Sequence, residues 1–303
     1  MSLRDCLRGG CAVREANRDR SRIYQVRLNP EVTNDARIIA AKYIPHNSLV
    51  LDVGSACGDF GLLLHKQRNC EVHGMEFSAA SIEVARETNA YANLHQVDLN
   101  AATGADFKSY YGRFDCIALL DVLEHLLTPD EVLPKLVPLL KKDGFFVISL
   151  PNVAFGDVKL QLLTNDFPYS DTGILDRTHL KFFTYITIAR FLAELRVEIV
   201  DCSVKVADVS CGGLALPDDV KRYVLKDPHS FVYQYVLKAS PSELSGEAVF
   251  RCNIERMSLE FDDINSVLRK VQRLKRWGSL FPPGSILRGF AKKVWLTAKR
   301  HQK

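Results

Sequence analysis

Short apolar runs alternate with amphipathic stretches through the first 240 residues of this 303-residue chain. An apolar run of about four to eight residues bounded by turn residues is typical of a strand buried in a parallel sheet, whereas a period of three to four predicts a helix packed against it. We predict strands at residues 49–53, 71–76, 94–97, 114–120, 145–150, 197–206 and 230–238. We predict helices at residues 33–43, 58–67, 78–89, 129–142 and 184–195. Because strands and helices alternate, these elements indicate an α/β fold with right-handed crossovers.

Capping and turn residues mark the ends of several of these elements. Thr33 or Asn34 is expected to cap the first helix, because both side chains accept hydrogen bonds from free helical N–H groups. Pro134 and Pro138 fall inside the fourth predicted helix and indicate that it is kinked or broken. The sequence Lys-Lys-Asp-Gly at residues 141–144 is typical of the end of that helix.

A glycine-containing turn follows the first predicted strand. Gly54 and Gly58 let the backbone bend sharply and approach a ligand without a Cβ in the way. The helix that follows offers unpaired N–H groups and the positive end of its dipole. Glu76 ends the second strand roughly twenty residues farther on, where a dinucleotide-binding fold places the carboxylate that binds ribose hydroxyls. Together, the turn and the acid predict a site for a nucleotide-like cofactor.

With these motifs in this order, the chain resembles the class I S-adenosylmethionine (SAM) dependent methyltransferases over residues 31–240. The resemblance implies a Rossmann-like methyltransferase fold, with a doubly wound, seven-stranded, mostly parallel sheet whose seventh strand is antiparallel and lies beside the fifth. The glycine turn matches the family's first motif, although Ala56 stands where the middle glycine is usual. Glu76 matches the ribose-binding acid, and the segment 97–99 matches the part that contacts adenine.

The resemblance therefore implies SAM as the cofactor. Asp52 and the N–H groups of the glycine turn suit the methionine end of SAM, although Asp52 could instead cap the helix that follows. Asp98 is expected to accept a hydrogen bond from the adenine amino group. The full set of expected cofactor-binding residues is Asp52, Gly54, Ser55, Gly58, Glu76, Phe77, Asp98, Leu99 and Asp121.

Two more polar stretches follow the fourth and fifth strands, at residues 121–126 and 173–184. If the first is helical, Asp121, Glu124 and His125 share one face. Both stretches resemble those of ubiquinone-type O-methyltransferases and of methyltransferases attached to bacterial sugar-polymer glycosyltransferases. The resemblance makes His125, His179 and Asp176 the candidate catalytic residues.

Three roles are open for the two histidines. Either can be the general base that takes the proton from an acceptor hydroxyl, since neutral imidazole suits that task near pH 7. Both can be metal ligands, because small-RNA 2′-O-methyltransferases bind a divalent ion with a similar motif. The matching residues are Asp121, Glu124, His125 and His179, which together suit Mg²⁺ or a transition metal. Both can also be structural, joining the two stretches by hydrogen bonds.

The loop at 153–181 and the insertion at 207–227 are expected to select the acceptor. The loop holds Phe155, Phe167 and Tyr169 among several acids, a mixture that suits a sugar and equally suits ordinary loop packing. From the resemblance, we expect methyl transfer to a hydroxyl of a sugar or glycan intermediate. The alternatives are a quinone-like phenol or another small molecule, or a SAM-binding subunit without catalysis.

Charge divides the chain near residue 263. The net charge is +4, whereas residues 264–303 hold eleven Lys or Arg and no acid, so the remainder carries 4 − 11 = −7. We expect a flexible basic lead-in at residues 1–30, a linker at 241–263 and a basic amphipathic helical tail at 264–303. The tail suits a solvated extension or peripheral contact with an anionic membrane, and nucleic acid is not the expected partner.

The start of the chain has no apolar signal-peptide core, and the eight cysteines show no metal-binding spacing. Reduced thiols and a cytoplasmic location are therefore expected. If the tail contacts a membrane, this location places it at the inner face.

Overall fold

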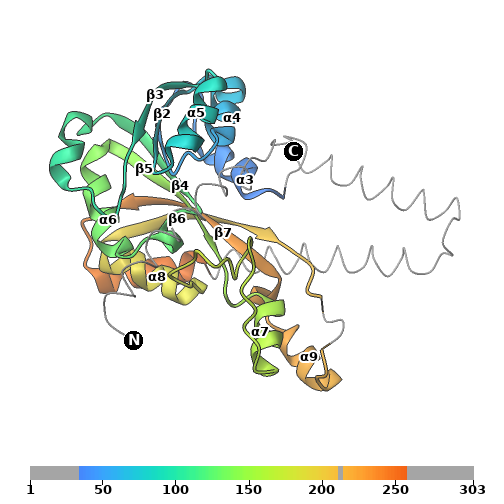
Figure 1. The fold of residues 1–303 in the computed structure, drawn as a ribbon. Coiled ribbons are helices and arrows are strands. Elements are labelled where there is room, and N and C mark those ends of the chain that lie inside the picture. Colours follow the sequence, from blue (N-terminus) through green and yellow to red (C-terminus); the bar gives the residue numbers. More distant parts are fainter. Residues whose placement is uncertain (1–33, 211–213, 258–303) are drawn as a thin grey trace, which may run out of the picture. The chain divides into compact units, whose positions relative to one another are not determined.

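A seven-stranded sheet forms the centre of the structure, a computed structural model that describes residues 34–210 and 214–257 (Figure 1). Its strands lie in the order β3-β2-β1-β4-β5-β7-β6. They are β1 (Leu49–Val53), β2 (Glu71–Glu76), β3 (Tyr91–Gln96), β4 (Phe114–Leu120), β5 (Leu140–Pro151), β6 (Val197–Val206) and β7 (Val232–Pro241). Neighbours from β3 to β5 are parallel, and β7 is antiparallel to both β5 and β6. This confirms the predicted doubly wound, mostly parallel sheet with an antiparallel seventh strand beside the fifth.

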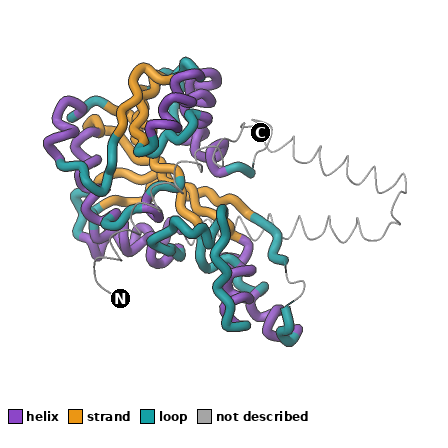
Figure 2. The backbone as a smooth tube through the Cα atoms, viewed as in Figure 1, coloured by secondary structure: helices purple, strands orange, loops and turns teal. Residues whose placement is uncertain are grey.

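Helices flank this sheet, joined by the loops that Figure 2 distinguishes by colour. The α-helices are α3 (Ala36–Tyr43), α4 (Asp59–Arg68), α5 (Ala79–Glu87), α6 (Pro129–Leu136), α7 (Gly156–Leu163), α8 (Tyr185–Glu194) and α9 (Asp218–Val224). The 3₁₀ turns are η2 (Gly104–Tyr110), η3 (Leu123–His125), η4 (Val137–Leu139) and η5 (Pro228–Phe231). Helices α3 and α4 pack in one core cluster with Val50 and Cys116. Leu51 and Ile117 point to the opposite face and are also fully buried, so both faces of the central strands are covered.

Helix α3 begins later than the sequence predicted. Its cap is Asp35, whose Oδ1 accepts from the Arg37 N–H at 2.9 Å, and not Thr33 or Asn34. The Asn34 side chain instead pairs with the backbone of Val206 in β6, with Nδ2 2.7 Å from the carbonyl oxygen and Oδ1 3.1 Å from the N–H. A side chain that bonds to a distant strand is not available to cap its own helix.

The predicted helix at 129–142 is wrong in its second half. Helix α6 ends at Leu136, η4 follows, and β5 already begins at Leu140. Pro138 lies in η4 and has no N–H with which to continue an α-helix. Residues 141–144 are therefore strand and not a helix end, and the Lys141 ammonium pairs with Asp115 of β4 at 2.7 Å.

Part of the predicted linker at 241–263 is also structured. Strand β7 extends through Pro241, and residues 246–257 are helical. Asn253 of that helix is fully buried: its Oδ1 accepts from the Ile199 N–H at 2.7 Å, and its Nδ2 donates to two backbone carbonyls, of Ala189 and Val197. This helix therefore belongs to the body of the fold.

The predicted lead-in at 1–30 and the predicted basic tail at 264–303 lie outside the described residues. Among the residues that are described, no helix combines the length and the apolar character that crossing a membrane requires.

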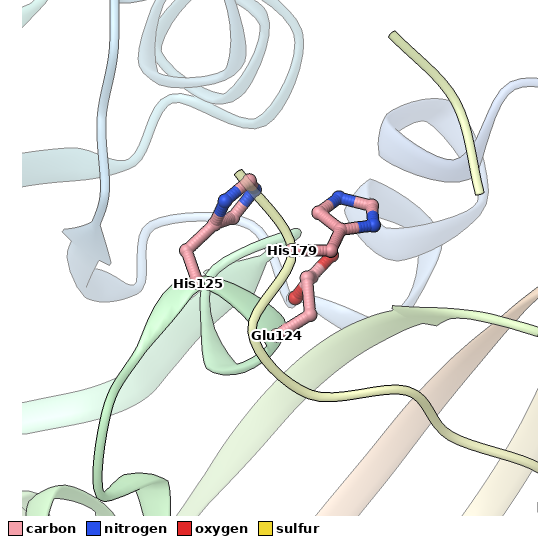
Figure 3. Close-up of side chains that lie close together, drawn as sticks. All are labelled: Glu124, His125 and His179. Carbon is pink, nitrogen blue, oxygen red and sulfur yellow. The ribbon is translucent and has the colours of Figure 1, made fainter. Parts of the chain in front are cut away.

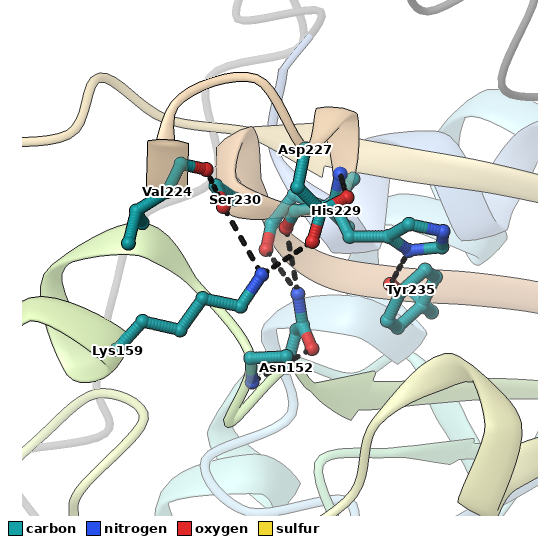
Figure 4. Close-up of polar contacts among 9 residues, drawn as sticks. Asn152, Lys159, Val224, Asp227, His229, Ser230 and Tyr235 are labelled. Carbon is teal, nitrogen blue, oxygen red and sulfur yellow. Dashed lines mark hydrogen bonds and ion pairs between the residues drawn. The ribbon is translucent and has the colours of Figure 1, made fainter. Parts of the chain in front are cut away.

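Polar contacts tie the segments after β5 to those before β7 (Figure 4). The Lys159 ammonium in α7 lies 2.5 Å from Asp227 and 3.1 Å from the Ser230 hydroxyl. Asn152, directly after β5, donates from Nδ2 to the carbonyls of His229 and Val232 at 3.1 and 2.8 Å. The loop and the insertion that we expected to select the acceptor are thereby joined to one another and to the edge of the sheet.

Candidate functional site

The glycine turn after β1 has the backbone geometry that its sequence requires. Gly54 and Gly58 have φ angles of +73° and +86°, and a Cβ on Gly54 would lie 2.6 Å from a methyl group of Val122. Ala56 also has a positive φ, +45°, which explains why glycine is usual at this position in the family it resembles. The N–H groups of Gly54 and Ser55 donate to the carbonyl oxygen of Met75 in β2. The turn therefore forms with alanine at position 56, although the Ala56 backbone is strained by its positive φ.

Glu76 holds the end of β2 against this turn. One carboxylate oxygen accepts from the Ala56 N–H at 2.9 Å, and the other accepts from the Ser78 N–H at 2.8 Å. An ionised carboxylate has about four acceptor positions, so two remain for other donors. Glu76 therefore stabilises the turn by hydrogen bonds and keeps acceptor positions available at the carboxyl edge of the sheet.

Exposed groups follow at the ends of β2 and β3, which are paired at Glu76 and Gln96. The Phe77 side chain is 61% exposed, and its carbonyl oxygen accepts from the Gln96 amide at 3.1 Å. Asp98 is exposed as well, and one of its oxygens accepts from the Asn100 N–H. Glu76, Phe77 and Asp98 thus stand at adjacent strand ends, where an aromatic face and two acids are open to a ligand.

Asp52 has a partner that the sequence did not reveal. Its Oδ2 accepts from the Tyr91 hydroxyl at 2.6 Å, and that hydroxyl accepts from the Gly61 N–H at 3.2 Å. Burial in β1 raises the pKa of Asp52 to about 7, despite the hydrogen bond from Tyr91, which lowers it. The capping alternative for Asp52 is wrong, because Gly58 is the N-cap of α4. Two glycines in the sequence are the signal that could have indicated a large side chain packed here. A Cβ at Gly61 would lie 2.2 Å from the Tyr91 ring, and one at Gly74 would lie 3.0 Å from it.

Asp121 lies in the turn after β4, with a φ of +58°. Residues 121–126 do not form one helix, so the condition for a shared helical face is not met; only residues 123–125 make the single 3₁₀ turn η3. The Asp121 Oδ1 accepts from the Ser149 hydroxyl at 2.9 Å and from the Gln234 side-chain amide. Asp121 is exposed as a residue, but the protein atoms around its carboxylate raise its pKa, and the hydrogen bond from Ser149 and the positive charge of Lys205 oppose that effect. The Asp121 carboxylate is therefore hydrogen-bonded to side chains of β5 and β7.

Glu124, His125 and His179 come together at the same edge of the sheet (Figure 3). The backbone N–H groups of Leu180 and Lys181 donate to the Glu124 carbonyl at 2.8 and 3.0 Å, which docks the loop after β5 onto η3. The two imidazole rings lie 4.7 Å apart at 73°. One ligand atom from each of the three side chains falls within 4.8 Å of the others. Of the four predicted metal ligands, Asp121 is the one outside this group.

Hydrogen bonds assign the protons on the two histidines. His125 Nδ1 lies 3.2 Å from the Thr178 carbonyl, and His179 Nδ1 lies 2.9 Å from the Ile174 carbonyl. Since a carbonyl can only accept, Nδ1 of each ring is the donor, and in the neutral form of the ring Nε2 carries a lone pair. Burial and the nearby His179 lower the pKa of His125 to about 4, so its ring is neutral near pH 7.

Glu124 is the least satisfied side chain of the site. It is 1% exposed, and neither carboxylate oxygen has a hydrogen-bond partner among the described residues. Burial, together with the negative charge of Asp121, raises the pKa of Glu124 well above its usual range. A buried carboxylate beside two imidazole lone pairs is a donor set for a divalent cation, or a place to hold a proton.

Three of the solved structures with a similar fold illustrate how low the sequence identity is. The 1,6-didemethyltoxoflavin-N1-methyltransferase of Burkholderia thailandensis, solved with S-adenosylhomocysteine and 1,6-didemethyltoxoflavin, is 14% identical, with a TM-score of 0.49 over 80% of this chain and 92% of that one. A putative methyltransferase of Haloferax volcanii, in complex with the methyltransferase activator Trm112, is 12% identical, with a TM-score of 0.49 over 80% and 99%. One from Bacillus halodurans is 16% identical, with a TM-score of 0.47 over 68% and 99%.

Sequence comparison gives a direct assignment. No curated protein sequence matches the chain. The family model described as "Methyltransferase domain" matches residues 24–200, which is more than half of the chain and contains the glycine turn, Glu76, Asp98 and the cluster of Glu124, His125 and His179. The chain therefore belongs to the methyltransferase-domain family and is a SAM-dependent methyltransferase.

Proposed function

We propose that this enzyme is an O-methyltransferase that acts on a hydroxyl of a sugar or glycan intermediate, with a divalent cation bound by Glu124, His125 and His179. The observation that carries the proposal is the buried Glu124 carboxylate without a partner beside two Nε2 lone pairs. Leaving a buried charge uncompensated is costly, and a divalent cation would compensate it. A bound cation would lower the pKa of an acceptor hydroxyl and orient it.

The adenosine part of SAM is assigned to the other half of the same edge. We propose that Glu76 accepts from the ribose hydroxyls, that Asp98 accepts from the adenine amino group, and that the exposed ring of Phe77 stacks on the purine. The glycine turn suits a closely approaching ligand, because Gly54 and Gly58 have positive φ angles and carry no Cβ. The buried Ser55 hydroxyl, which has no partner among the described residues, supplies a further polar group there.

Methyl transfer is an in-line displacement. The acceptor oxygen bonds to the methyl carbon as the carbon–sulfur bond breaks, and the hydroxyl proton leaves. The products are a methyl ether, S-adenosylhomocysteine and one proton. The protein's main task is to align oxygen, carbon and sulfur, and alignment alone supplies much of the rate. The lone pair on Nε2 of His125 or His179 is available to orient the hydroxyl or to take its proton.

The acceptor class is supported by the loop after β5. Phe155 is buried and Phe167 packs against its cluster, so these two rings serve the fold. Tyr169 packs edge-on against Phe167 and keeps 49% of its surface exposed, and in the sequence it lies between the acids Asp166 and Asp171, of which Asp171 pairs with Arg177. An exposed ring among acids suits a sugar, whose ring face stacks and whose hydroxyls donate. A quinone-like phenol stays the alternative acceptor.

Labelled SAM distinguishes these acceptors. The enzyme is incubated with nucleotide sugars, glycan fragments and quinone-like phenols, with and without Tyr169→Ala. We expect label in the sugar arm and at least a tenfold loss of kcat/KM with Tyr169→Ala. Label in phenols alone would remove the sugar proposal. Binding of SAM without turnover in any arm would remove the proposal of catalysis on these acceptors.

Metal removal tests the cation. Calorimetry with Mg²⁺, Mn²⁺ and Zn²⁺ is expected to give one site that Glu124→Gln abolishes, and chelation is expected to lower activity. Glu131→Gln in α6 is the matched control, because Glu131 is exposed. Equal cation binding by Glu124→Gln and the unaltered enzyme would contradict the proposed ligand, and full activity after chelation would contradict the proposed use of a cation.

A further inference from the structure

Thr178 lies between the His125 ring and the Asp176 carboxylate; it belongs to the polar stretch 173–184 but was not among the predicted site residues. Its backbone N–H and its hydroxyl both donate to Asp176 Oδ1, at 2.8 and 2.7 Å. The same hydroxyl oxygen lies 3.1 Å from His125 Nδ1, and the Thr178 carbonyl oxygen lies 3.2 Å from that nitrogen. One residue thus presents two oxygens to one ring nitrogen.

Proton counting determines the direction of these bonds. A threonine hydroxyl has one hydrogen, and here that hydrogen is directed at Asp176. Only lone pairs of the hydroxyl oxygen remain for His125, and the Thr178 carbonyl has only lone pairs as well. Both oxygens therefore act as acceptors, and Nδ1 of His125 must be the donor.

Without Asp176, the Thr178 carbonyl alone would favour this outcome, and the hydroxyl could oppose it. A hydroxyl free to rotate could donate to Nδ1, and the proton of a neutral ring would then move to Nε2. Asp176 is 2% exposed, so its carboxylate is a fixed acceptor and not a mobile surface group. The arrangement is the same as that of a carboxylate which orients a ligating or catalytic imidazole through its second nitrogen, with a hydroxyl inserted between them.

We infer that Asp176 and Thr178 are positioning residues, which hold His125 in its Nδ1–H tautomer and keep the Nε2 lone pair available to the acceptor or the cation. This assigns Asp176 a role through His125 in place of the direct catalytic role expected from the sequence. The inference rests on the proposed function for its effect on turnover, whereas the tautomer itself does not depend on it.

The tautomer is read by ¹⁵N NMR of histidine-labelled full-length enzyme near pH 7.5, without SAM, acceptor or cation. The His125 signals are assigned by their loss in His125→Ala. We expect Nδ1 to be the protonated nitrogen in the unaltered enzyme. Thr178→Val keeps the side-chain shape and removes one of the two acceptors, so the Nε2–H population is expected to rise by about fivefold. Thr178→Ser is expected to restore the original signals.

Turnover is measured on the same variants. Loss of a group that orients a ligand or base typically costs about 10- to 100-fold, and we expect that loss in kcat for Thr178→Val, with recovery in Thr178→Ser. Thr172→Val is the matched control, since Thr172 is an exposed residue of the same loop. Thermal unfolding confirms that each variant is folded.

The outcomes separate this inference from the proposed function. An Nε2–H ring in the unaltered enzyme, or identical tautomer ratios in Thr178→Val and the unaltered enzyme, would overturn the inference even if the enzyme methylates sugars. The expected NMR result in an enzyme that binds no cation would sustain the inference and refute the proposed cation site.

Discussion

Asp52→Asn tests the electrostatics of the β1 strand. Burial raises the pKa of Asp52 from 3.8 to about 7. Between these pH values the folded state holds a proton that the unfolded state has released. Stability therefore falls as the pH rises from about 4 to about 7, and it is level above that range. At about 1.4 kcal/mol per pH unit, the free energy of unfolding is expected to fall by about 4 kcal/mol across this interval.

Asparagine stays neutral over the whole range and can still accept the hydrogen bond from Tyr91. Urea unfolding of the full chain at pH 4, 5, 6, 7 and 8 is the measurement. The free energy of unfolding of Asp52→Asn minus that of the unaltered protein is expected to increase with pH, by about 4 kcal/mol in total. Taking this difference removes the contribution of groups that titrate alike in both proteins.

Asp143→Asn is the matched control, because Asp143 is an exposed acid of a strand. Its difference from the unaltered protein is expected to stay within about 0.5 kcal/mol across the range. A difference for Asp52→Asn that is equally flat would refute the reasoning. It would mean that Tyr91 and relaxation of the strand stabilise the ionised carboxylate as well as water does.

Three further changes test the packing and the backbone. Ala56→Gly removes the strain of a positive φ. The free energy of unfolding, measured in urea, is expected to stay unchanged or to rise by up to about 1 kcal/mol, and a clear decrease would contradict the strain. Gly61→Ala places a methyl group 2.2 Å from the Tyr91 ring and is expected to cost about 1 to 3 kcal/mol in urea unfolding, and no cost would show that the ring has room to move. Asn253→Leu leaves the Ile199 N–H without its partner and is expected to cost about 2 to 3 kcal/mol; a neutral result would show that the helix at 246–257 is not anchored there.

Much of the sheet could be predicted because its strands are apolar runs that end at turns. The bounds of β1, β2, β4 and β6 agree with the prediction to the residue. The antiparallel β7 came from family resemblance, since periodicity does not carry strand order. The start of β5 was missed because residues 141–143 are polar, as an exposed strand end permits, and because Pro138 resembles a helix kink as much as a helix end.

The helix at 246–257 shows a different limit. Val249, Asn253 and Met257 are fully buried at intervals of four, which is helical spacing. From sequence alone, an asparagine among these positions favours an exposed linker and not a buried helix face. Its burial makes sense only once Ile199 of β6 supplies an N–H for it to accept, and that donor lies 54 residues away in the chain.

The residues of the site also fall into two groups, those that the sequence could indicate and those that only the fold revealed. Strand ends reveal Glu76, Asp98 and Glu124, because topology brings the carboxyl ends of parallel strands to one edge. The partners of site residues come from remote segments without a local signal: Tyr91 for Asp52, and Gln234 for Asp121. The predicted strand ends could therefore indicate which residues gather, whereas their hydrogen-bond partners required the fold.

Local unfavourable features concentrate at the carboxyl edge of the sheet and indicate where function lies. Positive φ angles occur at seven described residues other than glycine; four are asparagines, which tolerate them, and two of the other three are Ala56 and Asp121, directly after β1 and β4. The three buried side-chain atoms without a partner among the described residues belong to Ser55 and Glu124, in the same two turns. Stability alone would favour removing each of these features. Their occurrence together is explained if SAM and the acceptor site supply the missing interactions, because each ligand then offsets a cost that the protein alone carries.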